Sequence, residues 1–277
     1  MRLAGRGMSG AEAQTVPADA NLLDKILEPG QLTVVFQPIL EVSGPHPRLF
    51  ALECLIRGPR GTSAERTDVL FEYIRRKRAE AVIDRACVAT SLAEAGLLPG
   101  EPRLSLNVHA KTLGRDPGFR AFLFERADEA GIEPRRLVLE IVEYAPENLD
   151  LPSFGRALAE LRESGIRIAL DDVGLGQSNY KMILDVKPEI FKLDRYLVSG
   201  AWSDPHRQVI LDSLARMVRR LEARAVAEGV ETKEELVAVE AAGIDLIQGY
   251  FFAHPGTRSE IVAAGYLSDL APAAGAR

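Results

Sequence analysis

Polar side chains stand at the ends of several apolar segments of this chain. In the clearest case, IRIALDDVGLG over 166–176, an apolar run stops at Asp171 and Asp172, and a loop with two glycines follows. A parallel strand of an α/β protein is buried on both faces and reads as nearly continuous apolar sequence. Carboxylates belong at the end of such a strand, where water and ions reach them, because a buried unpaired charge is costly. Taken alone, the pattern also fits an ordinary turn, since Asp and Gly are common turn residues.

The other apolar segments end in a similar way. Nearly every strand-like segment after the first brings a carboxylate, a carboxamide or a lysine. Each such residue alone has an ordinary explanation as an ion pair, a loop cap or a surface charge. The full set is Glu53, Asn107, Glu140, Asp171, Asp172, Lys192, Asp194, Glu228 and Gln248. Gathered at one rim, so many carboxylates would repel one another unless cations neutralised them. Mg²⁺ and Mn²⁺ prefer such oxygen ligands, and the number of acidic groups favours two ions bridged by one aspartate.

Two divalent ions about 4 Å apart commonly serve phosphodiester hydrolysis, because they lower the pKa of a water, orient it and neutralise phosphoryl charge. In such a site Lys192 would steady or deprotonate the attacking water, and Arg57 would hold a phosphate oxygen. Arg57 shares a strand face with Glu53 and Leu55, because alternate residues of a strand point to the same side.

Eight segments are typical of strands. They cover 32–40, 48–57, 103–108, 137–142, 166–170, 189–193, 224–227 and 246–248. The first two are joined without a helix, which predicts a hairpin and one antiparallel neighbour. The rest alternate with helical patterns over 67–77, 80–95, 118–130, 151–164, 178–185, 205–221, 233–242 and 258–265, and a further helix is predicted over 19–27.

This count predicts an α/β fold, a modified (β/α)8 TIM-like barrel with one antiparallel strand, whose active site lies at the carboxyl ends of the strands. An open doubly wound sheet is the alternative, but no G-x-G-x-x-G or P-loop motif follows a strand. We expect one barrel domain over 19–267, a flexible N-terminal extension over 1–18 and a flexible tail over 268–277.

Composition limits the classes of function. The chain has 277 residues, 47% of them hydrophobic, and a net charge of −6 with a pI near 5.4. That charge argues against a protein that grips DNA or long RNA through its phosphates. Cys54 and Cys87 have no metal-ligand spacing and are interpreted as reduced core residues of a cytoplasmic protein. No segment approaches the length of a membrane span.

The segment Glu53–Arg57, ECLIR, resembles the E-x-L-x-R signature of EAL-domain cyclic-di-GMP phosphodiesterases, with Cys54 at the alanine position. Seven further segments are similar to the successive motifs of that family, and they occur in the family's order. They are FQPI at 36–39, LNV at 106–108, LEIVE at 139–143, DDVGLG at 171–176, KLDR at 192–195, AEGVET at 227–232 and QGY at 248–250. The resemblance covers about 32–255.

The resemblance implies a metal-dependent phosphodiesterase that hydrolyses cyclic di-GMP to linear 5′-pGpG with two Mg²⁺ or Mn²⁺ ions. It assigns one ion to Glu53, Asn107, Glu140 and Asp171. The other ion falls to Asp171, Asp172 and Glu228, with Asp171 as the bridge.

The resemblance also assigns supporting roles. Lys192 would assist the nucleophilic water, Gln248 would support the site, and Glu143 would tether the loop after Asp172. The residues assigned to the substrate are Gln37, Leu55, Arg57 and Asp194. A homodimer through the loop after Asp172 and a separate regulatory protein are further expectations, and no membrane partner is expected.

One departure from the family pattern keeps a second function open. Where the family has D-D-F-G-T-G, this chain has Val173 and Leu175 in place of Phe and Thr. Because the family's loop links metal binding to dimer packing, the alternative is a catalytically weak or inactive cyclic-di-GMP receptor that signals through a protein partner. A third reading, a barrel lyase or enolase-like enzyme with Lys192 as base, conflicts with the Glu53–Arg57 signature. His109, where the family commonly has Ser, is interpreted as a packing or hydrogen-bonding residue.

Overall fold

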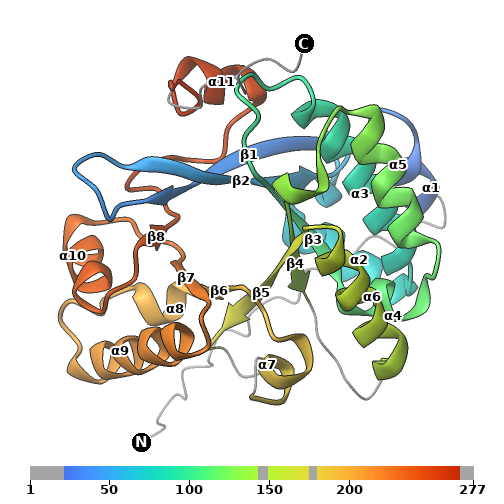
Figure 1. Cartoon of the computed structure of the whole chain (residues 1–277). Coiled ribbons are helices and arrows are strands. Elements are labelled where there is room, and N and C mark those ends of the chain that lie inside the picture. The colour runs from blue at the N-terminus through green and yellow to red at the C-terminus, as the bar shows by residue number, and fades with distance from the viewer. Residues whose placement is uncertain (1–21, 143–148, 175–179, 269–277) are drawn as a thin grey trace, which may run out of the picture.

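The structure, a computed structural model, describes residues 22–142, 149–174 and 180–268. Its eight strands form one closed barrel and follow one another around it in chain order (Figure 1). They are β1 (Thr33–Glu41), β2 (Arg48–Arg57), β3 (Leu104–His109), β4 (Leu137–Val142), β5 (Arg167–Val173), β6 (Ile190–Leu193), β7 (Arg224–Ala227) and β8 (Leu246–Ile247).

The strand β1 is the antiparallel member of the barrel. It runs antiparallel to β2, where Gln37 faces Glu53, and to β8, where Leu40 faces Ile247. All pairings from β2 round to β8 are parallel. The predicted modified barrel with one antiparallel strand is therefore confirmed.

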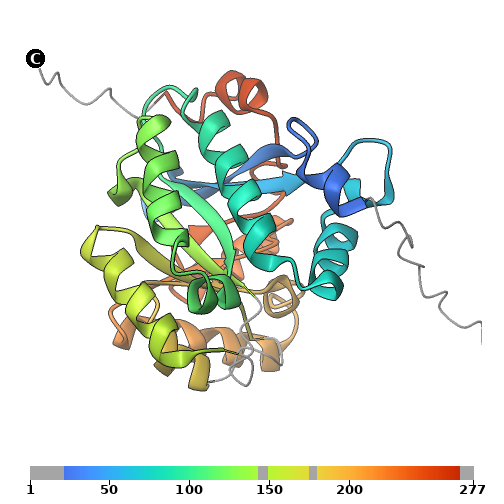
Figure 2. The same cartoon turned by 90° about the vertical axis from the view of Figure 1, so that its right-hand side faces the viewer.

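Helices cover the outside of the barrel (Figures 1 and 2). The longer ones are α2 (Thr67–Lys77), α3 (Glu80–Ala95), α5 (Phe119–Glu129), α6 (Leu151–Glu163), α7 (Tyr180–Val186), α9 (Pro205–Arg220) and α10 (Lys233–Ala241). Several of these helices have an N-cap that the local sequence provides. Asp204 caps α9 ahead of Pro205, and Thr232 and Glu235 form a capping box on α10. The helices predicted over 19–27 and 258–265 correspond to α1 (Leu22–Leu27) and α11 (Arg258–Ala263).

Four short elements were missed by the sequence reasoning. They are the helices α4 (Ala110–Arg115) and α8 (Arg195–Val198) and the 3-10 turns η1 (Ser63–Glu65) and η2 (Pro134–Arg136). Segments of three to six residues hold less than two helical turns, so hydrophobic periodicity cannot reveal them.

The lumen of the barrel is filled by a small apolar layer, separate from the larger core between strands and helices. Its members are Ile39, Phe50, Ala51, Val138, Ala169, Ile190, Val226 and Leu246. Alternate residues of a strand share a face, so the side chain two positions toward the carboxyl end of β2, β4, β5, β6, β7 and β8 also faces the lumen. Those side chains are Glu53, Glu140, Asp171, Lys192, Glu228 and Gln248. The fold thus stacks a polar layer directly above an apolar one.

The predicted extension over 1–18 and almost all of the tail over 268–277 fall outside the described residues, so the domain limits stay predictions. Within 22–142, 149–174 and 180–268, no helix combines the length and apolar character needed to cross a membrane.

Gly249, just after β8, is packed closely against the backbone of Val230. A Cβ there would lie 2.1 Å from the carbonyl oxygen and 2.4 Å from the backbone nitrogen of Val230. Because backbone atoms cannot rotate away, we expect Gly249→Ala to lower the free energy of unfolding by about 3 kcal/mol, the upper end for overpacking. Urea unfolding measures it.

The matched control is Gly155→Ala within α6, where an added Cβ meets nothing within 4 Å. It should raise the free energy of unfolding by about 0.5–1 kcal/mol, because Gly weakens a helix interior. Equal stability of Gly249→Ala and the unchanged protein would contradict the packing described for this loop.

Candidate active site

Lys192 lies at the centre of the polar layer and is 2% exposed. Its Nζ is 2.6 Å from Glu140 Oε2, 2.8 Å from Glu228 Oε1, 3.2 Å from Glu53 Oε2 and 3.3 Å from Asp171 Oδ1. These carboxylates come from four different strands or strand ends, β2, β4, β5 and β7, and are up to 175 residues apart in the chain. The structure therefore brings together side chains that the sequence analysis placed on one rim.

Carboxamides link Glu53 to the antiparallel strand. Asn107 Nδ2 donates to Glu53 Oε1 at 3.0 Å, and Gln248 Nε2 donates to Glu53 Oε2 at 2.6 Å. The same Gln248 nitrogen lies 3.2 Å from Gln37 Oε1, and Gln37 Nε2 donates to the carbonyl of Ala253 at 3.2 Å. Gln248 Oε1 is buried and has no hydrogen-bond partner among the described residues, so it offers a free acceptor.

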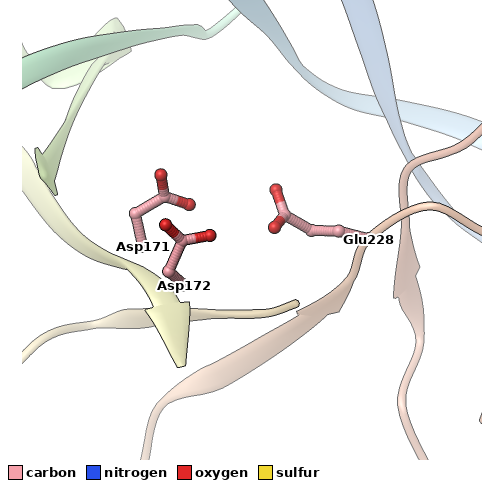
Figure 3. Close-up of side chains that lie close together, drawn as sticks. All are labelled: Asp171, Asp172 and Glu228. Carbon is pink, nitrogen blue, oxygen red and sulfur yellow. The ribbon is translucent and has the colours of Figure 1, made fainter. Parts of the chain in front are cut away.

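Asp171, Asp172 and Glu228 form the second part of the site. Their carboxylates face one another from the end of β5 and the segment after β7 (Figure 3), and one oxygen of each lies within 4.8 Å of the others. The backbone of Asp172 has φ +53°, in the left-handed region that Asp tolerates. The ladder between β5 and β6 is irregular between Leu170 and Val173. This turn breaks strict alternation, so two neighbouring aspartates reach one site.

Burial and mutual repulsion perturb the acidic groups. Burial, with the negative charges of Glu53 and Asp171, raises the pKa of Glu140 to about 8. Burial and the charges of Asp171 and Asp194 raise the pKa of Asp172 to about 6. Burial also raises the pKa of Glu228 well above its ordinary value. The carboxylates therefore crowd one another more than the surrounding protein can neutralise.

For Glu53 and Lys192 the surroundings instead favour the charged form. Burial opposes the charge of Glu53, but Lys192 and the hydrogen bonds from Gln248 and Asn107 bring its pKa below the ordinary value. Burial likewise opposes the charge of Lys192, yet the carboxylates around it hold its pKa well above the ordinary value. Lys192 is thus a cation in the protein alone.

The donor set fits hard divalent cations. Four carboxylates converge on one ammonium, Asp172 adds a fifth beside Asp171 and Glu228, and the nearby amide oxygens add neutral oxygen donors. No cysteine belongs to the group, and carboxylate and amide oxygens suit Mg²⁺ and Mn²⁺ rather than Zn²⁺. The uncompensated charge and the free Gln248 Oε1 are the observations that support an ion site here.

A cavity of about 310 Å³ opens from Glu53, Asn107, Asp171 and Asp172 toward α2 and α3. Leu55 lines this cavity. Its walls include apolar side chains, so it suits a ligand with a flat or apolar part.

The other residues assigned to the substrate lie around the mouth. Arg57 donates from Nη1 to the carbonyl of Ile56 and to Thr67 Oγ1, both at 3.1 Å. Asp194 accepts from the backbone nitrogen of Tyr196 at 2.6 Å and caps α8. Glu143 lies outside the described residues.

Sequence reasoning did not assign a role to Thr67 or Asp84. Thr67 Oγ1 accepts from Arg57 and donates to the carbonyl of Ile56, which fixes the arginine. The buried carboxylate of Asp84 lies 2.7 Å from His109 Nδ1 and also accepts from the hydroxyl of Thr112. His109 is therefore a hydrogen-bonding residue. Nothing in a single sequence signals such a contact between α3 and β3.

A closed β/α barrel with a carboxylate-lined mouth at the carboxyl ends of its strands defines the class of protein. Residues 20–255 match the family model described as "EAL domain", and the chain belongs to that family.

Three relatives illustrate the likeness. The chain is 40% identical over 126 residues to the "Probable cyclic di-GMP phosphodiesterase PdeG" of Escherichia coli K12, covering 46% of this chain and 25% of that protein. It is 27% identical over 154 residues to the "Blue light- and temperature-regulated antirepressor BluF" of the same organism, covering 56% and 38%. A structure of Klebsiella pneumoniae BlrP1 with manganese and cyclic di-GMP at pH 6 matches with a TM-score of 0.72 and 29% identity, covering 83% of this chain and 57% of BlrP1. The matches thus span between a quarter and three fifths of these relatives.

Proposed function

We propose that this protein is a metal-dependent phosphodiesterase that hydrolyses cyclic di-GMP to linear 5′-pGpG. The observation that carries the proposal is the convergence of Glu53, Glu140, Asp171 and Glu228 around Lys192 at the mouth of the barrel. The names of PdeG and of the BlrP1 complex support the substrate and the use of a divalent ion.

We assign two Mg²⁺ or Mn²⁺ ions to this site. One would be held by Glu53, Asn107, Glu140 and Asp171, and the other by Asp171, Asp172 and Glu228. When bound, such ions supply a nucleophilic water at neutral pH and neutralise charge on the phosphoryl oxygens.

The chain's own residues then bind and orient the reactants. Lys192, a cation among carboxylates, would orient the attacking water through its ammonium. Gln248 keeps Glu53 in position. Water adds to phosphorus, the bond to the 3′ oxygen breaks, and that oxygen leaves as a hydroxyl, which gives a 5′-phosphate. Gln37, Leu55, Arg57 and Asp194 would hold the dinucleotide, with Arg57 on a phosphate oxygen.

The direct test is turnover by the purified full chain. With Mg²⁺ or Mn²⁺ we expect cyclic di-GMP to disappear and pGpG to appear in equal amounts, followed by liquid chromatography. Chelation of divalent ions should stop the reaction, and re-addition of Mn²⁺ should restore it. Absence of pGpG under both metals would refute the proposal.

A second function is favoured by one relative and one sequence feature. BluF is named as an antirepressor, and the loop after Asp172 carries Val173 and Leu175. We propose as the alternative a receptor that binds cyclic di-GMP with little or no turnover and signals through a protein partner. Calorimetric binding of cyclic di-GMP with no pGpG formed would favour the receptor over the enzyme.

The expected homodimer would use the loop after Asp172. Residues 175–179 of that loop lie outside the described residues, but Gly174 lies against Leu197 of α8, where a Cβ would be 2.2 Å from Leu197 Cδ1. Gly229, beside Glu228, lies against Arg195, where a Cβ would be 2.5 Å from Arg195 Cγ. We propose that α8 connects both metal-binding segments to the surface on which a second copy or a regulatory protein would act.

A further inference from the structure

Arginines mark the amino ends of several barrel strands, opposite the acidic mouth. Arg48, Arg167 and Arg224 are the first residues of β2, β5 and β7, and Arg103 and Arg136 directly precede β3 and β4. The proposed hydrolysis uses none of them, because it takes place at the carboxyl ends of the strands.

Three of these arginines share the face of the strand that points into the lumen. Arg103, Arg167 and Arg224 each stand two residues before a lumen-facing side chain, namely Ser105, Ala169 and Val226. The guanidinium carbons of Arg103 and Arg224 lie 4.7 Å and 5.1 Å from the ring centroid of Phe50. The guanidinium groups of Arg103 and Arg224 thus lie below the apolar layer, and Arg167 starts from the same face of its strand.

Of these three arginines, only Arg224 forms ion pairs with carboxylates of the described residues. Arg224 Nη2 lies 2.7 Å from Glu41 Oε1 and 2.5 Å from Asp245 Oδ2. Within the described part of the chain, neither Arg103 nor Arg167 makes an ion pair. Burial, and then the positive charges of Arg167 and Arg224, lower the pKa of Arg103, so both neighbouring cations act on Arg103.

Arg103 also carries an orphaned donor. Its Nη1 donates to the carbonyl of Phe50 at 3.1 Å, whereas its Nε is buried with no hydrogen-bond partner in the described ranges. Stacking on Phe50 explains why Arg103 and Arg224 are here. It explains neither the unused Nε nor the third arginine, Arg167, which is exposed to solvent.

We propose that Arg103 and Arg167, with Arg224 beside them, form a binding site for a phosphate group at the amino end of the barrel. Guanidinium groups present several donors in a planar fork that matches phosphate oxygens, and a dianion would offset the repulsion between unpaired arginines. The ligand is either inorganic phosphate or the phosphate of a phosphomonoester. The site lies at the opposite end of the lumen from the acidic mouth and does not depend on the proposed hydrolysis.

The test is calorimetric titration of the full chain with inorganic phosphate, without divalent ions and at constant ionic strength set with sodium chloride. Under these conditions the carboxylates of the mouth repel phosphate. We expect saturable binding that Arg167→Gln weakens at least about tenfold, since a hydrogen bond to a charged group contributes roughly that factor. Arg156→Gln, an exposed arginine on α6, is the matched control and should bind as the unchanged protein does.

Two further arms complete the test. Arg103→Lys keeps the positive charge but loses the planar guanidinium, so it should also weaken binding. Arg103→Gln is avoided because it removes the cation stacked on Phe50 altogether. Tighter binding of 5′-GMP than of phosphate, lost in Arg167→Gln, would identify a phosphomonoester ligand, and equal binding would identify free phosphate. Equal affinity of Arg167→Gln and the unchanged protein, or no heat beyond that of the chloride control, would overturn the proposal.

Discussion

Asp171→Asn is expected to reduce the hydrolysis of cyclic di-GMP by about 100-fold or more while leaving the fold intact. Asp171 is the residue assigned to both ions, and loss of even a supporting group around a bound metal costs about 10- to 100-fold in affinity or activity. The measurement is the initial rate of pGpG formation with Mn²⁺, together with calorimetric Mn²⁺ binding, which should lose at least one of two equivalents.

The stability of Asp171→Asn separates loss of metal from loss of structure. The Asp171 carboxylate adds repulsion, since its charge contributes to the raised pKa values of Asp172, Glu140 and Glu228. Lys192 keeps three other carboxylates when Asp171 is neutral. The melting temperature without metal should therefore not fall. Glu72→Gln on α2, whose half-buried carboxylate pairs with Arg75 and Arg76, is the control and should retain full activity. Retained turnover in Asp171→Asn would remove Asp171 from the proposed metal site.

Much of the architecture could be predicted because it depends on local pattern. In β4 the apolar run 137–142 predicted the strand to the residue. In β5 the run 166–170 predicted the start to within one residue, whereas the strand continues through the two aspartates to Val173. The absence of a helix between β1 and β2 required the antiparallel pair. The sequence analysis placed Glu53, Glu140 and Lys192 at the carboxyl ends of their strands, and two-residue alternation from the apolar layer explains why they face the lumen.

The features that could not be predicted from the sequence depend on contacts between residues distant in the chain and on local backbone conformation. The convergence of four carboxylates on one Lys192 depends on barrel closure, which brings β2 and β7 to one axis. The left-handed backbone of Asp172 leaves no trace in residue type, since Asp also accepts the extended conformation. Thr67 and Asp84 act through side chains whose partners, Arg57 and His109, stand 10 and 25 residues away without any spacing rule.

The two ends of the lumen carry opposite charge, and this contrast follows from the same two-residue alternation. On β5 and β7 the lumen-facing side chains read arginine, small apolar residue and carboxylate, as Arg167, Ala169 and Asp171 show for β5. The apolar middle layer keeps the two charged layers apart, because an ion would lose its hydration there. Each layer must therefore find its own counter-ions, which is why we infer cations at one end and an anion at the other.

Lys192→Met is expected to abolish turnover and to make the stability of the protein depend on divalent ions. Removing the ammonium leaves Glu53, Glu140, Asp171 and Glu228 without their central cation. Loss of one partner from a buried ion pair costs about 3–5 kcal/mol, so the free energy of unfolding without metal should fall by that amount. Addition of Mn²⁺ should recover most of the loss, because the ions neutralise the same carboxylates, while turnover stays absent. Chemical unfolding with and without Mn²⁺ measures both effects.

The pH dependence of this loss has a definite sign. The pKa of Glu140 is raised from 4.5 to about 8 even with Lys192 present. Between pH 4.5 and 8, Glu140 is therefore protonated in the folded protein and ionised in the unfolded chain. The stability that this proton binding by Glu140 contributes is fully present below about pH 4.5 and is lost as the pH rises through 8. The loss in Lys192→Met should therefore be small near pH 5 and largest above pH 8. Lys233→Met, at an exposed position at the start of α10 where the described residues provide no ion pair, is the control and should show neither the metal dependence nor the pH dependence. A Lys192→Met protein that is as stable without metal as with it would mean that the carboxylates do not share one ion-binding centre.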